Sequence, residues 1–250
     1  MVMISAKDIW KSYGNNNVLK GLSLDVEKGE TVVILGRSGV GKSVLLRQIM
    51  GLERPDKGTI IVDNVSICEL KGATLYKSLS QMGMLFQGGA LFDSMTIGEN
   101  TAFYLTQHGD PYTKKKLSED EIQERVKTAL SMVGLKDTED KMPSDLSGGM
   151  KKRAALARLI VYRPSILLYD EPTTGLDPIT AMQINELIVQ TQKELNATSI
   201  VVTHDLRSAM TVGNRIALHH EGKIAHISEK ELFLKSEDPL IKNFLQDALL

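Results

Sequence analysis

Short runs of consecutive apolar and β-branched residues recur along the chain and predict buried strands. The runs cover 32–35, 60–62, 166–169 and 199–203. A continuous apolar run is typical of a strand that is covered on both faces of its sheet. Apolar residues at helical spacing lie between these runs and predict helices over 44–50, 154–161 and 181–195. Strands that alternate with helices indicate an α/β fold with a largely parallel sheet.

Two regions depart from this alternation. In 1–30, apolar and polar residues alternate between turns at 14–17 and 28–29, which predicts an antiparallel β portion. Region 97–160 has a mostly helical pattern. We therefore expect one unit of 250 residues with three parts: a core of 1–87 and 162–227, a helical subdomain of 88–161, and an amphipathic helical segment of 228–250.

Composition narrows the class of protein. The chain is 42% apolar and 24% charged, with a net charge of −1, so no bulk basic field favours nucleic acid as a partner. Cys68 is the single cysteine, which excludes an intrachain disulfide and a cysteine-rich zinc site. The sequence has neither a membrane-length apolar run nor a signal-peptide pattern at its start. We expect a soluble intracellular protein.

A glycine-rich segment carries the first chemical signal, because it matches the pattern G-x-x-x-x-G-K-[ST] between a predicted strand and a predicted helix. Its residues are Gly36, Arg37, Ser38, Gly39, Val40, Gly41, Lys42 and Ser43. Glycines let successive backbone N–H groups turn inward, and the helix that follows begins with unpaired N–H groups and a positive dipole end. Lys42 would reach the β- and γ-phosphates, and the Ser43 hydroxyl would ligate Mg²⁺. The segment predicts a nucleotide site.

Two adjacent carboxylates end the strand 166–169. Asp170 suits a Mg²⁺ partner, and Glu171 suits a general base for an attacking water. The alternative is a pair of solvated acids at a strand end. His204 and Gln87 also follow apolar strands, where open α/β sheets bind ligands. His204 would contact the γ-phosphate or the water, although a lone histidine is more often structural; Gln87 would contact Mg²⁺ or water.

The segment Leu146-Ser147-Gly148-Gly149-Met150 completes a set of motifs in a recognisable order. With it, the chain resembles the ATP-binding subunits of ABC transporters over essentially its full length. The resemblance implies catalytic roles for Glu171, His204 and Gln87, and ligation of Mg²⁺ by Ser43, Gln87 and Asp170. It further implies contacts with ATP from the residues of the glycine-rich loop and from Tyr13, Ser147, Gly148, Gly149 and Asp177. Tyr13 matches the aromatic residue that stacks on adenine, and Asp177 belongs to the D-loop.

The same resemblance implies partners. Two copies would pack head to tail, each ATP lying between one copy's phosphate loop and the other copy's signature at 147–149. A separate membrane permease would dock near Gln87, where Met82, Met84, Met95 and Phe92 offer a soft apolar surface. The chain would then be cytoplasmic and peripheral on the inner face of the inner membrane. Met150 departs from the family, which mostly has glutamine there.

Several segments are similar to the ATPases of Mla-type lipid transporters, which work with MCE-family proteins. They cover 84–92, 142–145, 153–158, 177–180 and 238–245. The implied cargo is phospholipid that moves between envelope membranes. Three alternatives remain: a transporter for amino acids, peptides or drugs, an ABC ATPase of DNA repair or translation, and a P-loop metabolic kinase. The signature argues against the kinase, and the lack of a coiled coil or tandem domain argues against the repair ATPase.

The remaining polar features have simpler interpretations. The basic run Lys114-Lys115-Lys116 is a solvated loop or, alternatively, a contact for anionic lipid headgroups. His219, His220 and His226 lack metal-like partners in sequence and are interpreted as structural.

Overall fold

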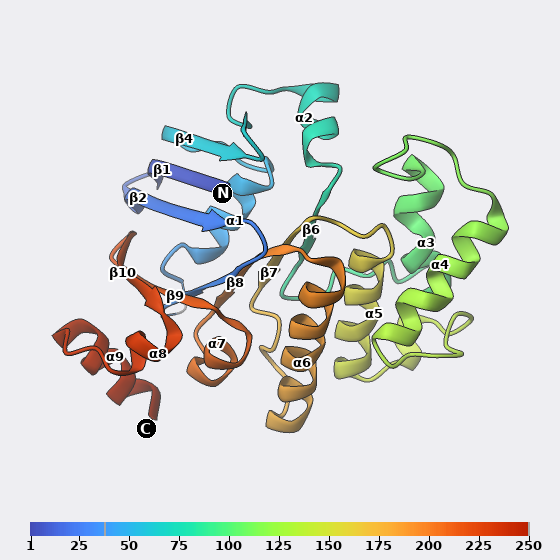
Figure 1. Ribbon diagram of the computed structural model, residues 1–250. Coiled ribbons are helices and arrows are strands. Elements are labelled where there is room, and N and C mark those ends of the chain that lie inside the picture. Colours follow the sequence, from blue (N-terminus) through green and yellow to red (C-terminus); the bar gives the residue numbers. More distant parts are fainter. Residues whose placement is uncertain (38, 250) are drawn as a thin grey trace.

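The computed structural model describes residues 1–37 and 39–249, with side chains described up to residue 246. The described chain forms two sheets and a group of helices (Figure 1). The strands are β1 (Val2–Tyr13), β2 (Asn16–Glu27), β3 (Thr31–Leu35), β4 (Lys57–Val62), β5 (Val65–Ser66), β6 (Met82–Leu85), β7 (Ile166–Asp170), β8 (Thr198–Thr203), β9 (Arg215–His220) and β10 (Lys223–Glu229). The helices are α1 (Lys42–Ile49), α2 (Gly72–Leu79), α3 (Ile97–His108), α4 (Glu119–Met132), α5 (Gly148–Ile160), α6 (Pro178–Leu195), α7 (Leu206–Val212), α8 (Lys230–Leu234) and α9 (Pro239–Leu249), with a 3-10 turn at Pro143–Asp145.

The larger sheet has six strands in the order β10-β9-β3-β8-β7-β6. Strands β9, β3, β8, β7 and β6 run parallel, and only β10 pairs antiparallel with its neighbour β9. The smaller sheet has the order β2-β1-β4-β5 and is antiparallel throughout. The predicted α/β fold with an antiparallel β portion is confirmed.

Both faces of the larger sheet are covered, as continuous apolar runs predict. Val33 and Leu35 of β3 point into a core formed with α3 to α7, whereas Val32 and Ile34 point into a second core formed with α1 and the smaller sheet. One strand therefore contributes alternate side chains to two cores.

Local capping fixes the helix starts in the helical region. Thr96 and Ser118 begin α3 and α4 with capping boxes that Glu99 and Glu121 complete. Helices α3, α4 and α5 gather at one side of the molecule, while α8 and α9 lie at the opposite side (Figure 1). Among the described residues, no helix combines the length and the apolar character that a bilayer span requires.

Three predictions about elements need correction. Residues 60–62 form a strand, but it belongs to β4 of the antiparallel sheet, where it pairs with β1. The helix predicted over 154–161 from apolar spacing, and from about Met150 to Tyr162 from its place after the signature, is α5 and starts at Gly148, because Ser147 caps it. Segment 228–250 begins with the end of strand β10 and then forms two short helices, α8 and α9. The division into core and helical subdomain stays a prediction.

Helix α5 lies directly against the edge strand β6. Gly83 of β6 has no room for a side chain, because an added Cβ would collide with the Leu159 side chain and lie 2.6 Å from the Tyr162 hydroxyl. Tyr162 also donates a hydrogen bond to the carbonyl oxygen of Met82 at 3.0 Å. Near the other end of α5, the Lys152 ammonium donates to the carbonyl oxygen of Gln87, just after β6. The helix is thus fastened to β6 and its following loop at two places.

Candidate functional site

The carboxyl ends of the parallel strands border a cavity of about 310 Å³. It is lined by Val18, Gly39, Gly41, Lys42, Ser43, Val44, Gln87, Glu171, Thr174 and His204. These side chains come from β2, the loop before α1, α1 itself, and the segments that follow β6, β7 and β8. Ligands of open α/β sheets bind at this edge, because parallel strands end there together. The structure therefore brings the glycine-rich loop, Gln87, Glu171 and His204 to one place.

The glycine-rich loop reaches α1 through a left-handed residue. Gly41 precedes the helix at φ 105°, a conformation that L side chains rarely adopt. A Cβ on Gly41 would also lie 2.5 Å from Cγ1 of Val18. Among the described residues no side chain caps α1, so the helix start is open to an anion, although the Val44 N–H already bonds to the carbonyl oxygen of Gly41 at 3.1 Å.

Lys42 is held under the loop that it follows. Its ammonium donates to the carbonyl oxygens of Gly36 at 2.8 Å and Arg37 at 2.9 Å, and it lies 3.4 Å from Oε1 of Glu171. The residue is only 5% exposed, and this burial lowers the pKa of Lys42, although the charge of Glu171 acts in the opposite direction.

Ser43 and Asp170 form the second pair of the site. The Ser43 hydroxyl donates to Oδ1 of Asp170 at 2.6 Å. Burial raises the pKa of Asp170, and the charge of Glu171 adds to this effect, whereas the Ser43 hydrogen bond opposes it. A hydroxyl, a carboxylate and the nearby Gln87 are oxygen donors of the kind that Mg²⁺ prefers, so the residues fit that ion.

Glu171 contacts three other residues at the cavity. Its Oε2 accepts a hydrogen bond from the Thr174 hydroxyl at 3.1 Å and lies 2.9 Å from Nδ1 of His204. The Glu171 side chain is 10% exposed and the His204 side chain 47%. The backbone of Glu171 adopts φ 47°, a sparsely populated region for a non-glycine residue. The turn after β7 thereby places its carboxylate beside Lys42 and His204.

Other predicted site residues lie elsewhere. Tyr13 ends β1 and is 45% exposed, with its hydroxyl bonded to Glu53 and the Lys11 ammonium 5.5 Å from the centre of its ring. Arg37 and Val40 line a separate cavity beside α9, and Gly36 packs against the backbone of His219. Ser38 lies outside the described residues.

The signature residues form a structure of their own. Ser147 caps α5 by accepting a hydrogen bond from Met150 N at 3.3 Å. A Cβ on Gly149 would lie 2.5 Å from Cγ2 of Thr180 in α6, so α5 begins against the start of α6. Asp177 caps α6 by accepting hydrogen bonds from the N–H groups of Ile179 and Thr180. The described lining of the cavity includes none of Ser147, Gly148, Gly149 and Asp177.

Sequence reasoning missed three contributors to this site. Val18 and Thr174 line the cavity, and Lys152 anchors the Gln87 backbone from α5. Burial lowers the pKa of Lys152. A threonine three residues after Glu171 in the motif DEPTT was a usable signal. Lys152 belongs to the basic run Lys151-Lys152-Arg153, which the sequence left as a phosphate contact or a solvated face; its contact with Gln87 was not predicted. Val18 carried no signal, because only the folding of distant segments brings it to the site.

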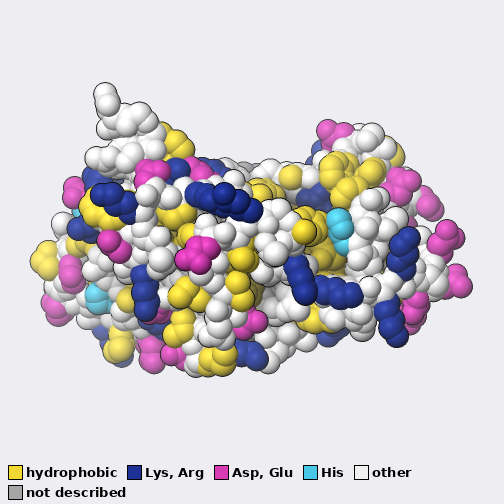
Figure 2. Space-filling view, turned by 90° about the horizontal axis from the view of Figure 1, so that it is seen from above, with side chains coloured by type: hydrophobic (Ala, Val, Ile, Leu, Met, Phe, Trp, Pro, Cys, Tyr) yellow, Lys and Arg dark blue, Asp and Glu magenta, His cyan; other side chains and the backbone are white. Residues whose placement is uncertain are grey.

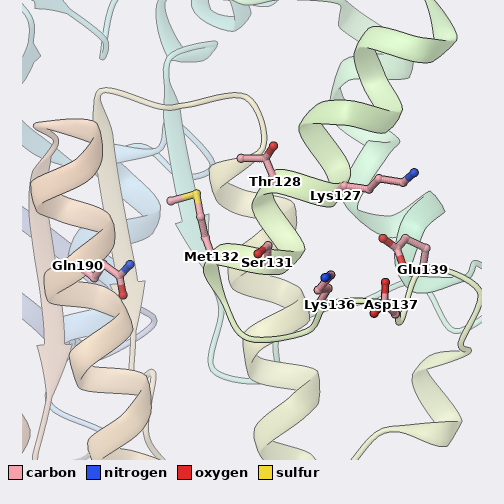
Figure 3. A pocket seen from close by; sticks show the side chains of 8 residues that line it. All are labelled: Lys127, Thr128, Ser131, Met132, Lys136, Asp137, Glu139 and Gln190. Atoms are coloured by element: carbon pink, nitrogen blue, oxygen red, sulfur yellow. The ribbon is translucent and has the colours of Figure 1, made fainter.

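A larger hollow of about 760 Å³ lies away from this chemistry. Its side chains come from α4, the loop that follows it and Gln190 of α6 (Figure 3). Lys127 and Lys136 line it together with Asp137 and Glu139, so charges of both signs meet there.

Comparison with known proteins decides the family. Residues 19–174 match the family model described as "ABC transporter". The chain belongs to the ABC transporter family. This ABC protein is the ATP-binding, ATP-hydrolysing component of a transporter. Its match covers the phosphate loop, the signature and the two carboxylates.

Relatives of this ABC ATPase have different names. It is 41% identical to the "probable ribonucleotide transport ATP-binding protein mkl" of Mycobacterium leprae, over 98% of this chain and 69% of that protein. It is 38% identical to the "intermembrane phospholipid transport system ATP-binding protein MlaF" of Haemophilus influenzae, over 98% of this chain and 90% of that protein. A solved dimer of the ATP-binding cassette MJ0796, in a post-hydrolysis state with ADP and Pi, superposes with a TM-score of 0.81 at 32% identity, covering 91% of this chain and 98% of that one.

Proposed function

We propose that this ABC ATPase hydrolyses ATP with Glu171 as the general base. The position of the Glu171 carboxylate supports this most directly: Oε1 lies 3.4 Å from the Lys42 ammonium, and Oε2 lies 2.9 Å from Nδ1 of His204. The Lys42 ammonium binds the β- and γ-phosphates of ATP. This binding weakens its contact with Oε1 of Glu171, and that oxygen can then accept a proton from water. His204 positions the Glu171 carboxylate and the γ-phosphate. General-base catalysis of this kind contributes typically 10²–10⁴-fold.

Mg²⁺ would be held by Ser43, Asp170 and Gln87, and it would supply positive charge at the β- and γ-phosphates. Burial raises the pKa of Asp170 because it disfavours the charged carboxylate. A bound cation would stabilise that charged form, so the site favours one. Tyr13 would stack on the adenine with the face of its ring opposite Lys11.

The signature residues would act in a second copy of the chain. Ser147, Gly148, Gly149 and Asp177 lie outside the cavity lining. Ser147, Gly148 and Gly149 stand at the start of α5, whose positive dipole end suits an anion, and Asp177 caps the neighbouring helix α6. A head-to-tail dimer would bring them to the partner's ATP. Ile179 and Met182, which follow Asp177, are 71% and 55% exposed, as expected for residues that a partner copy covers.

The membrane permease would dock in a groove beside Gln87. A cavity of about 400 Å³ is lined there by Phe86, Phe92, Phe103, Tyr104 and Arg158, among others. Phe86 and Phe92 are 37% and 41% exposed. An aromatic groove with few charges suits an amphipathic helix of the permease.

For the cargo we propose phospholipid, moved between envelope membranes with an MCE-type protein in the complex. Support comes from the MlaF relative, of which this chain spans 90%, and from the segments of Mla type. The ATPase would then be cytoplasmic and peripheral on the inner membrane. A transporter for another cargo is the second candidate, which the ribonucleotide name of the mycobacterial relative favours.

The test is purification of the Glu171→Gln chain from native membranes with ATP present, followed by identification of the associated proteins and lipids. A permease, an MCE-type protein and enriched phospholipid are the expected result. A permease with a soluble solute-binding protein and no lipid enrichment would overturn the cargo but leave the ATPase role. The same purification without ATP is the control for nonspecific lipid.

A further inference from the structure

A second cleft opens between α2 and α3, beside the groove proposed for the permease. Its volume is about 480 Å³, and its lining includes Ala73, Tyr76, Lys77, His108 and Lys114. In the view from above, apolar side chains gather around a histidine in a hollow of this face, with Lys and Arg side chains next to them (Figure 2).

Helix α2 frames one side of this cleft and buries none of its eight described residues. It rises at the top of the molecule (Figure 1), and Tyr76 on it is 56% exposed. Isolated helices of this length are unstable in water, and amphipathic helices in proteins are stabilised by packing of their apolar face. Leu75 and Leu79 pack the inner face of α2 against the second core, whereas Tyr76 lies on the face that borders the cleft. The exposed part of Tyr76 leaves apolar surface on that face for a partner.

Contacts with the helical region hold α2 just after its carboxyl end, at Ser80, and in its middle, at Tyr76. The Tyr104 hydroxyl donates to the carbonyl oxygen of Ser80 at 2.9 Å, and the Lys114 ammonium donates to the Ser80 hydroxyl at 3.2 Å. The Tyr76 hydroxyl lies 2.7 Å from Nε2 of His108. The His108 ring also lies 5.2 Å from the ring centres of both Tyr76 and Tyr104. The floor of the cleft is thus aromatic and already ordered.

The charges that line the cleft have one sign. Lys77 and Lys114 line it, and no carboxylate does among the described lining residues. Lys115 and Lys116 follow in the same exposed loop. This charge pattern attracts an anionic group and disfavours a cationic one.

The loop that carries Lys114 is fixed in place. Oδ1 of Asp110 accepts hydrogen bonds from the N–H groups of Tyr112 at 2.9 Å and Thr113 at 2.8 Å, and its Oδ2 accepts one from Arg125 at 2.8 Å. Lys114 itself has a φ of 59°, which is uncommon for a side chain of this size. A loop ordered before binding loses less entropy when a partner arrives.

The cleft adjoins the neighbouring aromatic groove, because Tyr104 lines both. The Tyr104 ring stacks on Tyr162 at 4.0 Å between centroids and separates the two. A subunit that fills the groove therefore lies next to the cleft.

We infer that the cleft between α2 and α3 is a second docking site for the membrane subunit and takes an acidic segment of it. Carboxylates of that segment pair with Lys77 and Lys114, and its apolar side chains pack against Ala73, Tyr76 and His108. This inference rests on the proposed permease partner. The apolar and aromatic part of the lining favours a peptide over a lipid headgroup. A peptide has apolar side chains that can cover the rings of the lining, whereas a headgroup would supply only its phosphate.

Photo-crosslinking in native membranes tests the inference. A benzophenone amino acid replaces Ala73 in the cleft, Phe103 in the groove, or Thr128 at the remote hollow of Figure 3. We expect Ala73 and Phe103 to crosslink to different peptides of the membrane subunit, with aspartate or glutamate in the Ala73 peptide, and Thr128 to crosslink to neither.

Charge variants then test the pairing. Lys77→Glu with Lys114→Glu should lower the Ala73 crosslink about fivefold, as the loss of two exposed ion pairs implies, and leave the Phe103 crosslink unchanged. The pair Lys77→Arg and Lys114→Arg should keep both crosslinks. The matched control, Lys127→Glu with Lys136→Glu, removes two lysines from the remote hollow and should leave both crosslinks intact.

The two proposals fail in different ways. A Phe103 crosslink to the membrane subunit with none from Ala73 would overturn the second docking site and leave the permease proposal standing. An Ala73 adduct with phospholipid or with a second copy of the chain would also overturn the acidic segment. Absence of the membrane subunit from both crosslinks would contradict the permease proposal itself.

Discussion

The two glycine-containing helix starts, before α1 and before α5, are built in opposite ways. Among the described residues the start of α1 has no side-chain cap, and the segments after three strands supply Gln87, Glu171 and His204 to its cavity. The signature before α5 is capped by Ser147 and packed on the start of α6. The first start thus shares a cavity with three polar side chains, whereas the described lining of that cavity includes no signature residue.

The difference indicates where the reaction is assembled. Lys42 and Glu171 are 5% and 8% exposed, so their charges act in a medium of low polarity where each contact is strong. The signature adds no acid, base or metal ligand to the chain's own cavity. We propose that a single copy holds the groups for phosphate binding and proton transfer, and that the second copy supplies the remaining contacts.

The largest expected effect comes from Glu171→Gln. Removal of the base should slow ATP hydrolysis by about 10²–10⁴-fold, while the phosphate loop still binds ATP and the dimer persists. Steady-state turnover and size-exclusion chromatography with ATP measure the two properties. Glu194→Gln, at an exposed carboxylate bonded to Gln190, is the control. Unchanged turnover in Glu171→Gln would remove Glu171 from the mechanism.

The next effect concerns the stability of the folded chain at acidic pH, through His219, which packs against Gly36 of the phosphate loop. His219 is 3% exposed, and neither ring nitrogen has a hydrogen-bond partner among the residues that the structure describes. Burial, with a contribution from the charge of Lys42, lowers the pKa of His219 to about 4. As pH falls below about 6.5, the unfolded chain binds a proton that the folded chain excludes, which costs about 2 kcal/mol of stability by pH 5.

Thermal unfolding between pH 7 and pH 5 measures this loss. We expect His219→Leu to flatten the pH dependence of the unfolding temperature, whereas His220→Leu, at the exposed neighbour, should not. An equal slope in wild type and His219→Leu would show that another group controls acid stability.

The smallest effect separates the signature from an ordinary helix start. Ser147→Ala removes a helix cap and should cost about 1 kcal/mol, a fall of about 2–4 °C in unfolding temperature. Ser118→Ala removes the cap of α4 and should cost about the same. Only Ser147→Ala should also reduce ATP-dependent dimerisation. Equal dimerisation of the two variants would contradict a role for Ser147 at the partner's nucleotide.

Much of the molecule could be predicted from local pattern. The strand β3, the phosphate loop and the pair Asp170-Glu171 are each a continuous segment of the sequence, so apolar runs and motif spacing located each of them. The placement of 60–62 was wrong because a short apolar run fits either kind of sheet, and its partner β1 lies about fifty residues earlier. The contact of Lys152 with Gln87 and the cleft beside α2 depend on packing between distant segments, which no local pattern encodes.

The clamps on α5 have a mechanical consequence. A helix of 13 residues is a rod about 20 Å long, with the signature at its tip. Leu159 and Tyr162 pack the opposite end of the helix against Gly83. Lys152 bonds the half that carries the signature to the backbone of Gln87, which lies beside the groove proposed for the permease. Arg158 adds hydrogen bonds to the carbonyl oxygens of Gly89 and Ala90 in the same loop. We therefore expect the loop at 87–90 and α5 to move together, so that a displacement imposed at Gln87 also moves the signature at the start of the helix.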